Sequence, residues 1–136
     1  MAPNGTNKNE SKSYIRILLA EDNDTNYLLL KIILKGYNLI RVNNGEKAVK
    51  KAKELLFDII LMDIRMPIMD GLAAIKAIRE FNKDTPILAI TADVDKQKEA
   101  SNAGCNGFIA KPFKTSELLK SINYLLSGQN HQYCID

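Results

Sequence analysis

The chain has 136 residues, of which 46% are hydrophobic and 26% are charged, and its formal net charge at pH 7 is +3. This composition is typical of one folded globular domain and argues against a disordered chain. The net charge is too small to predict nucleic-acid binding. The lysines of the segment 45–56 surround an apolar stripe, as they do on the solvent face of a helix.

No apolar run reaches the ~20 residues of a membrane-spanning helix. The polar start MAPNGTNKNESKS also lacks the apolar segment of a signal peptide. We therefore expect a cytoplasmic domain without membrane contact. The two cysteines, Cys105 and Cys134, have no metal-ligand spacing, so we predict reduced thiols. The only histidine, His131, lies in the C-terminal tail, where we expect it to be solvated, and Ser-His-Asp chemistry is thereby excluded.

Short apolar runs alternate with longer amphipathic segments along residues 14–127, which we predict to form one domain. A polar tail or linker at 1–13 precedes it, and a tail at 128–136, too short for an output domain, follows it. The predicted strands cover 15–20, 39–42, 58–62, 87–90 and 107–110, and the predicted helices cover about 25–35, 45–56, 72–81, 95–103 and 116–126. Their order predicts an α/β fold, a doubly wound five-stranded parallel sheet with five helices.

The ends of the helices carry recognisable capping residues. Asn44 and Thr115 stand where N-caps are expected, and Gly36 and Gly104 stand where C-caps are expected. Strands such as IILM and ILAI are apolar at every position, which predicts that helices cover both faces of the sheet.

Three acids interrupt the apolar sequence after the first strand, in the segment LLAEDND. The spacing of Asp22, Asp24 and Asn26 is that of a calcium loop, but Tyr27 replaces the required glycine and Ile33 replaces the bidentate glutamate. A calcium loop is therefore excluded. Taken alone, the acids could also serve to stabilise the N-terminus of the following helix.

Polar residues follow four of the five predicted strands. Glu21 and Asp22 follow the first strand, Asp63 the third, Thr91 the fourth and Lys111 the fifth. The carboxyl ends of parallel strands meet at one edge, where such sheets bind their ligands. Three carboxylates there favour Mg²⁺. An anionic Asp63 could attack a phosphorus atom without a general base, while Thr91 and Lys111 bind the oxygens of the phosphoryl group.

Four motifs in the order LLAEDN, DIILMDIRMPIMDG, ILAITA and GFIAKPF extend this pattern over residues 14–126. With these motifs the chain resembles the receiver domains of two-component response regulators, which have a flavodoxin-like fold. The resemblance implies that Asp63 accepts the phosphoryl group and that the backbone carbonyl of Arg65 joins the three acids around Mg²⁺. It also implies that Thr91 is the switch hydroxyl, that Phe108 is the switch aromatic residue, and that the peptide bond between Lys111 and Pro112 is cis.

The resemblance further implies a partner, which is a histidine kinase or a histidine phosphotransfer protein. The segment 27–34, YLLLKIIL, has one polar residue in eight. It is either a fully buried helix or a helix that exposes apolar side chains, and we favour the second alternative. Leu29, with Asn26 nearby, would then dock the partner's helix beside the acids. The motif AEDN followed by Asn26 also resembles the receivers of hybrid sensor histidine kinases.

Arg65 and Asp93 each lie two residues beyond a predicted site residue. In receivers these positions flank the path of the water that hydrolyses the acyl phosphate. The two charges either pair as a lid over the phosphoryl group or remain separate on the surface.

Two other functions compete with a receiver. A haloacid-dehalogenase-type phosphatase also uses an aspartate nucleophile and Mg²⁺, but it needs a second aspartate where this chain has Arg65. The second rival is a receiver-like module that binds partners without phosphorylation, and the complete set of acidic and basic residues argues against it. A dinucleotide-binding turn is excluded because the first turn lacks glycines. We therefore expect a domain that phosphorylates itself and slowly loses the phosphoryl group, and not an enzyme in the usual sense.

Overall fold

The computed structural model describes residues 12–128 and 133–134. Strands and helices alternate along most of the chain, as predicted. In chain order they are β1 (Arg16–Ala20), α1 (Asp24–Ile33), β2 (Asn38–Val42), α2 (Gly45–Glu54), β3 (Ile59–Asp63), α3 (Gly71–Arg79), β4 (Ile87–Thr91), the 3₁₀ turn η1 (Val94–Lys96), α4 (Gln97–Ala103), β5 (Gly107–Ala110), α5 (Thr115–Leu126) and β6 (Tyr133–Cys134).

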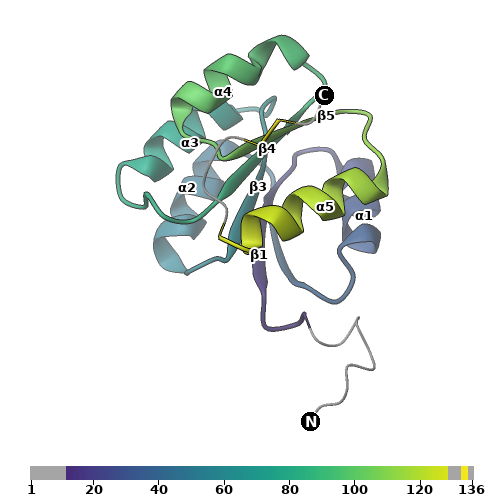
Figure 1. The fold of residues 1–136 in the computed structure, drawn as a ribbon. Coiled ribbons are helices and arrows are strands. Elements are labelled where there is room, and N and C mark those ends of the chain that lie inside the picture. The colour runs from purple at the N-terminus through teal and green to yellow at the C-terminus, as the bar shows by residue number, and fades with distance from the viewer. Residues whose placement is uncertain (1–11, 129–132, 135–136) are drawn as a thin grey trace.

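The strands form one parallel sheet in the order β2-β1-β3-β4-β5-β6. Helices α1 and α5 cover one face, and α2, α3 and α4 cover the other (Figure 1). Alternate residues of each strand enter the two cores, because side chains of a strand point to opposite faces in turn. In β1, for example, Leu18 packs with the α2–α4 layer while Leu19 packs with the α1–α5 layer. The doubly wound fold is therefore confirmed.

The sheet has one more strand than predicted. β6 is a two-residue strand in the C-terminal tail, and its backbone pairs in parallel with Gly107 and Phe108 of β5. Two residues without an alternating or apolar run give no detectable sequence pattern, so the sequence predicted five strands. Residues 1–11 of the predicted N-terminal tail and His131 lie outside the described residues.

The element boundaries differ from the predicted ones by a few residues. The predicted helix at 95–103 is a 3₁₀ turn followed by the short helix α4. Asn44 caps α2 by accepting the N–H of Lys47 at 2.8 Å, as predicted. Gly104 is also the C-cap of α4, with a φ of 120° that favours glycine.

Two capping predictions were wrong. The N-cap of α5 is Lys114 and not Thr115, because the Glu117 carboxylate accepts the Lys114 backbone N–H at 2.8 Å. The C-cap of α1 is Leu34, and Gly36, with a φ of 102°, lies two residues later in the turn toward β2. In the part of the chain that the structure describes, each helix is too short or too polar to cross a bilayer.

Candidate functional site

Three carboxylates meet at the carboxyl edge of the sheet. Glu21 and Asp22 follow β1, and Asp63 is the last residue of β3, which lies beside β1. One oxygen from each carboxylate lies within 4.8 Å of the other two. Glu21 and Asp63 are buried, at 1% and 6% exposure, whereas Asp22 is exposed. The pairing of β1 with β3 thus brings Asp63 next to two acids that lie 41 and 42 residues earlier in the sequence.

Lys111 supplies the positive charge of this cluster. Its ammonium Nζ lies 2.9 Å from Asp63 Oδ2 and 3.3 Å from Glu21 Oε1. Burial alone would lower the pKa of Lys111. The hydrogen bond and charge of Asp63, together with Glu21, outweigh burial and hold this pKa above its ordinary value. Lys111 is therefore a cation at neutral pH.

The carboxyl group of Glu21 has a raised pKa in this cluster. Burial and the charge of Asp63 raise the pKa of its carboxyl above the ordinary value, although a hydrogen bond from the Asn23 backbone N–H and the charge of Lys111 oppose the shift. The Asn23 bond to Glu21 Oε2 is 3.1 Å long. The anionic form of Glu21 is thus destabilised until a further cation joins the cluster.

The loops after β3 and β4 bring the remaining polar groups to the same edge. Thr91, the last residue of β4, is buried, and its hydroxyl oxygen accepts the Asp93 backbone N–H at 3.1 Å. The Arg65 backbone N–H donates to Asp63 Oδ1, also at 3.1 Å. Phe108, the residue that the resemblance gives as the switch aromatic, lies on β5 and is buried, at 4% exposure.

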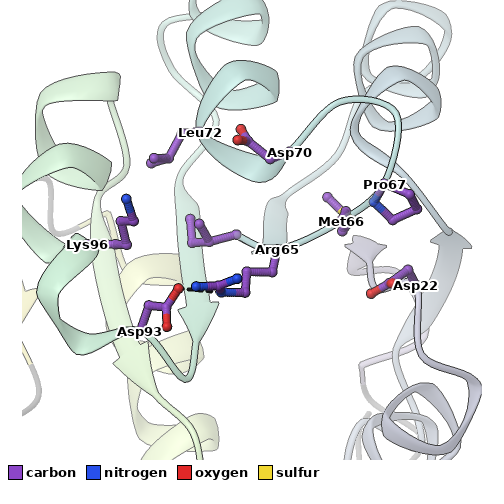
Figure 2. Close-up of a pocket in the computed structure, with 9 residues that line it drawn as sticks. Asp22, Arg65, Met66, Pro67, Asp70, Leu72, Asp93 and Lys96 are labelled. Carbon is purple, nitrogen blue, oxygen red and sulfur yellow. Dashed lines mark hydrogen bonds and ion pairs between the residues drawn. The ribbon is translucent and has the colours of Figure 1, made fainter.

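An open cavity of about 600 Å³ borders the cluster at Asp22, one of its lining residues (Figure 2). Arg65 forms an ion pair with Asp93 at its rim, so the two charges are paired and not separate. That the pair acts as a lid stays a prediction. In Figure 2 the guanidinium of Arg65 points toward Asp93, while Asp22 lies on the opposite side of Arg65. The lining residues are Asp22, Ile64, Arg65, Met66, Pro67, Asp70, Leu72, Asp93 and Lys96.

Two glycines allow the loop between β3 and α3 to pack against the site. A Cβ atom on Gly71 would lie 2.2 Å from the backbone oxygen of Asp63, and a Cβ on Gly45 would lie 2.3 Å from that of Met69. Both distances are far shorter than a van der Waals contact, so neither position accommodates a side chain without moving the backbone. The glycine of the motif MDG therefore fixes how closely α3 approaches the end of β3.

Helix α1 exposes apolar side chains, as predicted. Leu28, Leu29 and Ile32 are 56%, 53% and 72% exposed, whereas Leu30 and Leu34 are buried against the sheet. A second cavity, of about 310 Å³, lies between α1 and the start of the loop that leads to α5. Its lining includes both predicted docking residues and two site residues, in the set Glu21, Asn26, Leu29, Leu30, Ala92, Lys111, Pro112 and Phe113. The peptide bond between Lys111 and Pro112 is cis, as predicted.

Sequence reasoning did not identify Arg41 as part of this region. Arg41 lies on β2, at the sheet edge next to β1, and its side chain reaches the acidic turn at Glu21 and Asp24. One signal was available, since an arginine interrupts the otherwise apolar segment LIRV of a strand.

Comparison with known proteins agrees with this arrangement. The family model for the response regulator receiver domain matches residues 17–123. The chain belongs to this family. This chain is 43% identical over 109 residues to the autoinducer 2 sensor kinase/phosphatase LuxQ of Vibrio vulnificus. The match covers 76% of this chain and 13% of LuxQ. The chain is 41% identical to hybrid signal transduction histidine kinase B of Dictyostelium discoideum, covering 80% of the chain and 6% of the kinase. The receiver thus spans a small part of these relatives.

Solved receiver structures have the same fold. One is the receiver domain of the sensor histidine kinase PA1611 from Pseudomonas aeruginosa PAO1, with a magnesium ion in its active site cleft. It shares 35% identity and a TM-score of 0.79, covering 83% of this chain and 98% of that one. The chemotaxis response regulator CheY4 of Vibrio cholerae shares 31% identity and a TM-score of 0.77, covering 82% and 98% of the two chains.

The residues at the edge of the sheet fit a magnesium ion. Carboxylate oxygens are the hard ligands that Mg²⁺ prefers, and three of them lie within 4.8 Å of one another. Lys111 contacts only two of the three acids, Glu21 and Asp63. The exposed Asp22 faces the open cavity, where a hydrated ion has room for its water ligands.

Proposed function

We propose that this receiver takes a phosphoryl group from a partner's phosphohistidine onto Asp63. The observation that carries the proposal is the position of the Asp63 carboxylate. One oxygen, Oδ2, is held by Lys111 at 2.9 Å, and the other, Oδ1, is held by the Arg65 backbone N–H at 3.1 Å. Asp63 is also the acid of the cluster that adjoins both Thr91 of the neighbouring strand and the acids of β1.

The chemistry follows from these groups. An oxygen of the Asp63 carboxylate forms a bond to phosphorus while the bond from phosphorus to the partner's imidazole nitrogen breaks. The electron pair of that bond remains on the imidazole, which takes up a proton as the neutral leaving group. The product is an acyl phosphate on Asp63. Lys111 and the Thr91 hydroxyl bind the oxygens of the phosphoryl group, since phosphoryl transfer depends mainly on positioning and charge neutralisation.

We infer that Glu21, Asp22, Asp63 and the backbone carbonyl of Arg65 hold Mg²⁺. When bound, the ion supplies positive charge that offsets the repulsion between the acids and the incoming phosphoryl group. Thr91 and the buried Phe108 would then report the phosphorylated state to other surfaces of the domain. Burial and rotamer must carry that signal at Phe108, which has no hydroxyl group.

The exposed face of α1 fits the phosphodonor protein. Leu28, Leu29 and Ile32 form an apolar patch, and Leu29 also lines the cavity that reaches Lys111. An apolar helix of a histidine kinase or a histidine phosphotransfer protein could bury this patch and bring its phosphohistidine to the rim. The relatives among sensor and hybrid kinases support a receiver that serves such a kinase. We propose that it does so in the cytoplasm.

The proposal is tested by phosphorylation with acetyl phosphate and Mg²⁺. Intact mass spectrometry should show the addition of one phosphoryl group to the wild type and none to Asp63→Asn. Asp58→Asn is the matched control, since Asp58 precedes β3 at the opposite end and accepts the Arg16 backbone N–H at 2.8 Å. Normal labelling of Asp63→Asn would show that another residue is the acceptor.

A further inference from the structure

Arg41 forms three contacts with the acidic turn after β1 and with the start of α1, the helix that follows it. Its Nε donates to the backbone oxygen of Glu21 at 2.8 Å, and its Nη2 donates to Asp24 Oδ1 at 2.9 Å. The guanidinium carbon also lies 4.5 Å from the centroid of the Tyr27 ring, within the range of a cation–π contact. The side chain of Arg41 is only 20% exposed.

These contacts fix both ends of the turn that carries the acids. Glu21 begins the turn, and Asp24 is the first residue of α1. The backbone N–H of Glu21 also donates to the backbone oxygen of Val42, at 3.0 Å. Arg41 and its neighbour Val42 therefore link the edge strand β2 to the turn on which Glu21 and Asp22 are mounted.

We propose that Arg41 is a positioning residue that holds Glu21 and Asp22 in the orientation required for Mg²⁺ binding. This inference rests on the proposed function. Mg²⁺ demands near-octahedral geometry, so a turn that samples several orientations binds it less tightly. A planar guanidinium that donates in two directions and stacks on an aromatic ring restrains such a turn in a way that a flexible ammonium cannot.

The charge of Arg41 acts in the opposite direction from its contacts. A cation near the acids repels a second cation, so removal of the charge alone should strengthen Mg²⁺ binding. Loss of the contacts should weaken it. The sign of the change in affinity therefore distinguishes a positioning role from a simple charge effect.

The experiment is isothermal titration of the metal-free protein with Mg²⁺. We compare Arg41→Gln, which loses the charge and most contacts, with Arg41→Lys, which keeps only the charge. Arg41→Lys should bind Mg²⁺ about tenfold more weakly, within the range for residues that orient metal ligands. Arg41→Gln should also bind it more weakly, but by a smaller factor, because the lost charge offsets part of the loss. Arg16→Gln is the matched control. Arg16 also donates to a backbone oxygen, that of Leu56 at 3.1 Å, but this bond lies before the start of β3, at the end of the sheet opposite the acids. This control should bind Mg²⁺ like the wild type.

A second measurement needs no metal. Amide hydrogen exchange at Asn23, inside the turn, should be faster in both Arg41 variants than in the wild type and in the Arg16 control. Thermal unfolding of each variant checks that the domain remains folded.

The outcomes separate this inference from the proposed function. Unchanged or tighter Mg²⁺ binding by Arg41→Gln, or wild-type affinity in Arg41→Lys, would overturn the positioning role alone. Absence of Mg²⁺ binding by the wild type would overturn both. Unchanged exchange at Asn23 in both variants would also contradict the positioning role.

Discussion

Neutralising Glu21 and Asp22 should change the stability of the domain in opposite directions with and without Mg²⁺. The perturbation is the double substitution Glu21→Gln and Asp22→Asn, which keeps the shapes of both side chains. In the metal-free protein it removes the repulsion between these acids and Asp63. It also removes a buried charge, since Glu21 is 1% exposed.

The geometry of the cluster sets the size of the effect. Two carboxylate charges 4.8 Å apart repel by about 3.5 kcal/mol at an effective dielectric constant of about 20. Solvent screens the exposed Asp22, and the variant loses the 3.3 Å contact between Glu21 and Lys111, so only part of this repulsion is recovered. We expect a gain of about 1–3 kcal/mol in the metal-free free energy of unfolding, which raises Tm by roughly 5–10 °C.

Magnesium should reverse the order of the two proteins. At a concentration a thousand times its Kd, a ligand that binds only the folded state stabilises it by about 4.1 kcal/mol, which exceeds the metal-free gain of the double variant. The wild type should gain this stability and the double variant should gain none. Thermal unfolding followed by circular dichroism, with and without Mg²⁺, measures both effects.

The matched control for this experiment is Asp70→Asn. Asp70 lines the same cavity but is the N-cap of α3, and asparagine is an equally good N-cap. Asp70→Asn should keep the Mg²⁺-dependent rise in Tm. A double variant that is less stable than the wild type without metal, or that keeps the rise, would refute the account of the cluster.

Three further predictions follow from other parts of the site. Leu29→Asp should slow phosphotransfer from a phosphohistidine protein but not from acetyl phosphate. Leu29→Asp should leave Tm nearly unchanged. The control Leu30→Ala should lower the free energy of unfolding, measured in urea, by about 2–5 kcal/mol. Strong destabilisation by Leu29→Asp would show that Leu29 belongs to the core. If the Arg65–Asp93 pair acts as one lid, Arg65→Ala should speed the decay of the acyl phosphate about two- to fivefold, and adding Asp93→Ala should change the rate little. Equal or slower decay in Arg65→Ala would contradict the lid. Gly71→Ala should reduce both Tm and labelling by acetyl phosphate, since its Cβ would meet a backbone oxygen of β3 at 2.2 Å, and normal labelling would show that the loop can move aside.

The order of the elements could be predicted because each buried strand carries its own local signal. The runs IILM and ILAI are apolar throughout because helices cover both faces, and β3 and β4 are indeed buried at every residue. The edge strand β2 is less buried, yet its apolar residues were sufficient for the prediction. Helix ends were predicted less well, because they depend on hydrogen bonds such as that between Lys114 and Glu117.

The membership of the candidate site could be predicted from position alone, but its contacts could not. Glu21, Asp63 and Lys111 follow strands whose carboxyl ends must share an edge, whatever the side chains do. That Lys111 contacts Glu21 and Asp63 depends on the path of the loop after β5, which has no local pattern. Arginine within the apolar segment LIRV was a local signal at Arg41, but the partners of its hydrogen bonds could not be predicted, because these bonds join an edge strand to residues 17 and 20 positions away in sequence.

The strand order is a further reason to propose Asp63, and not Glu21 or Asp22, as the residue that accepts a phosphoryl group. β3 lies between β1, which carries the other two acids, and β4, which carries Thr91. Asp63 therefore has ligands for a cation on one side and a hydroxyl donor on the other. Lys111 starts from β5, two strands away at about 4.8 Å per strand, and only a long side chain can reach Asp63 across that distance. Lys111 also contacts Glu21 at 3.3 Å, but an acceptor on β1 would lie one strand further from Thr91. The central position of β3 therefore places Asp63 between the acids that follow β1 and the hydroxyl of Thr91.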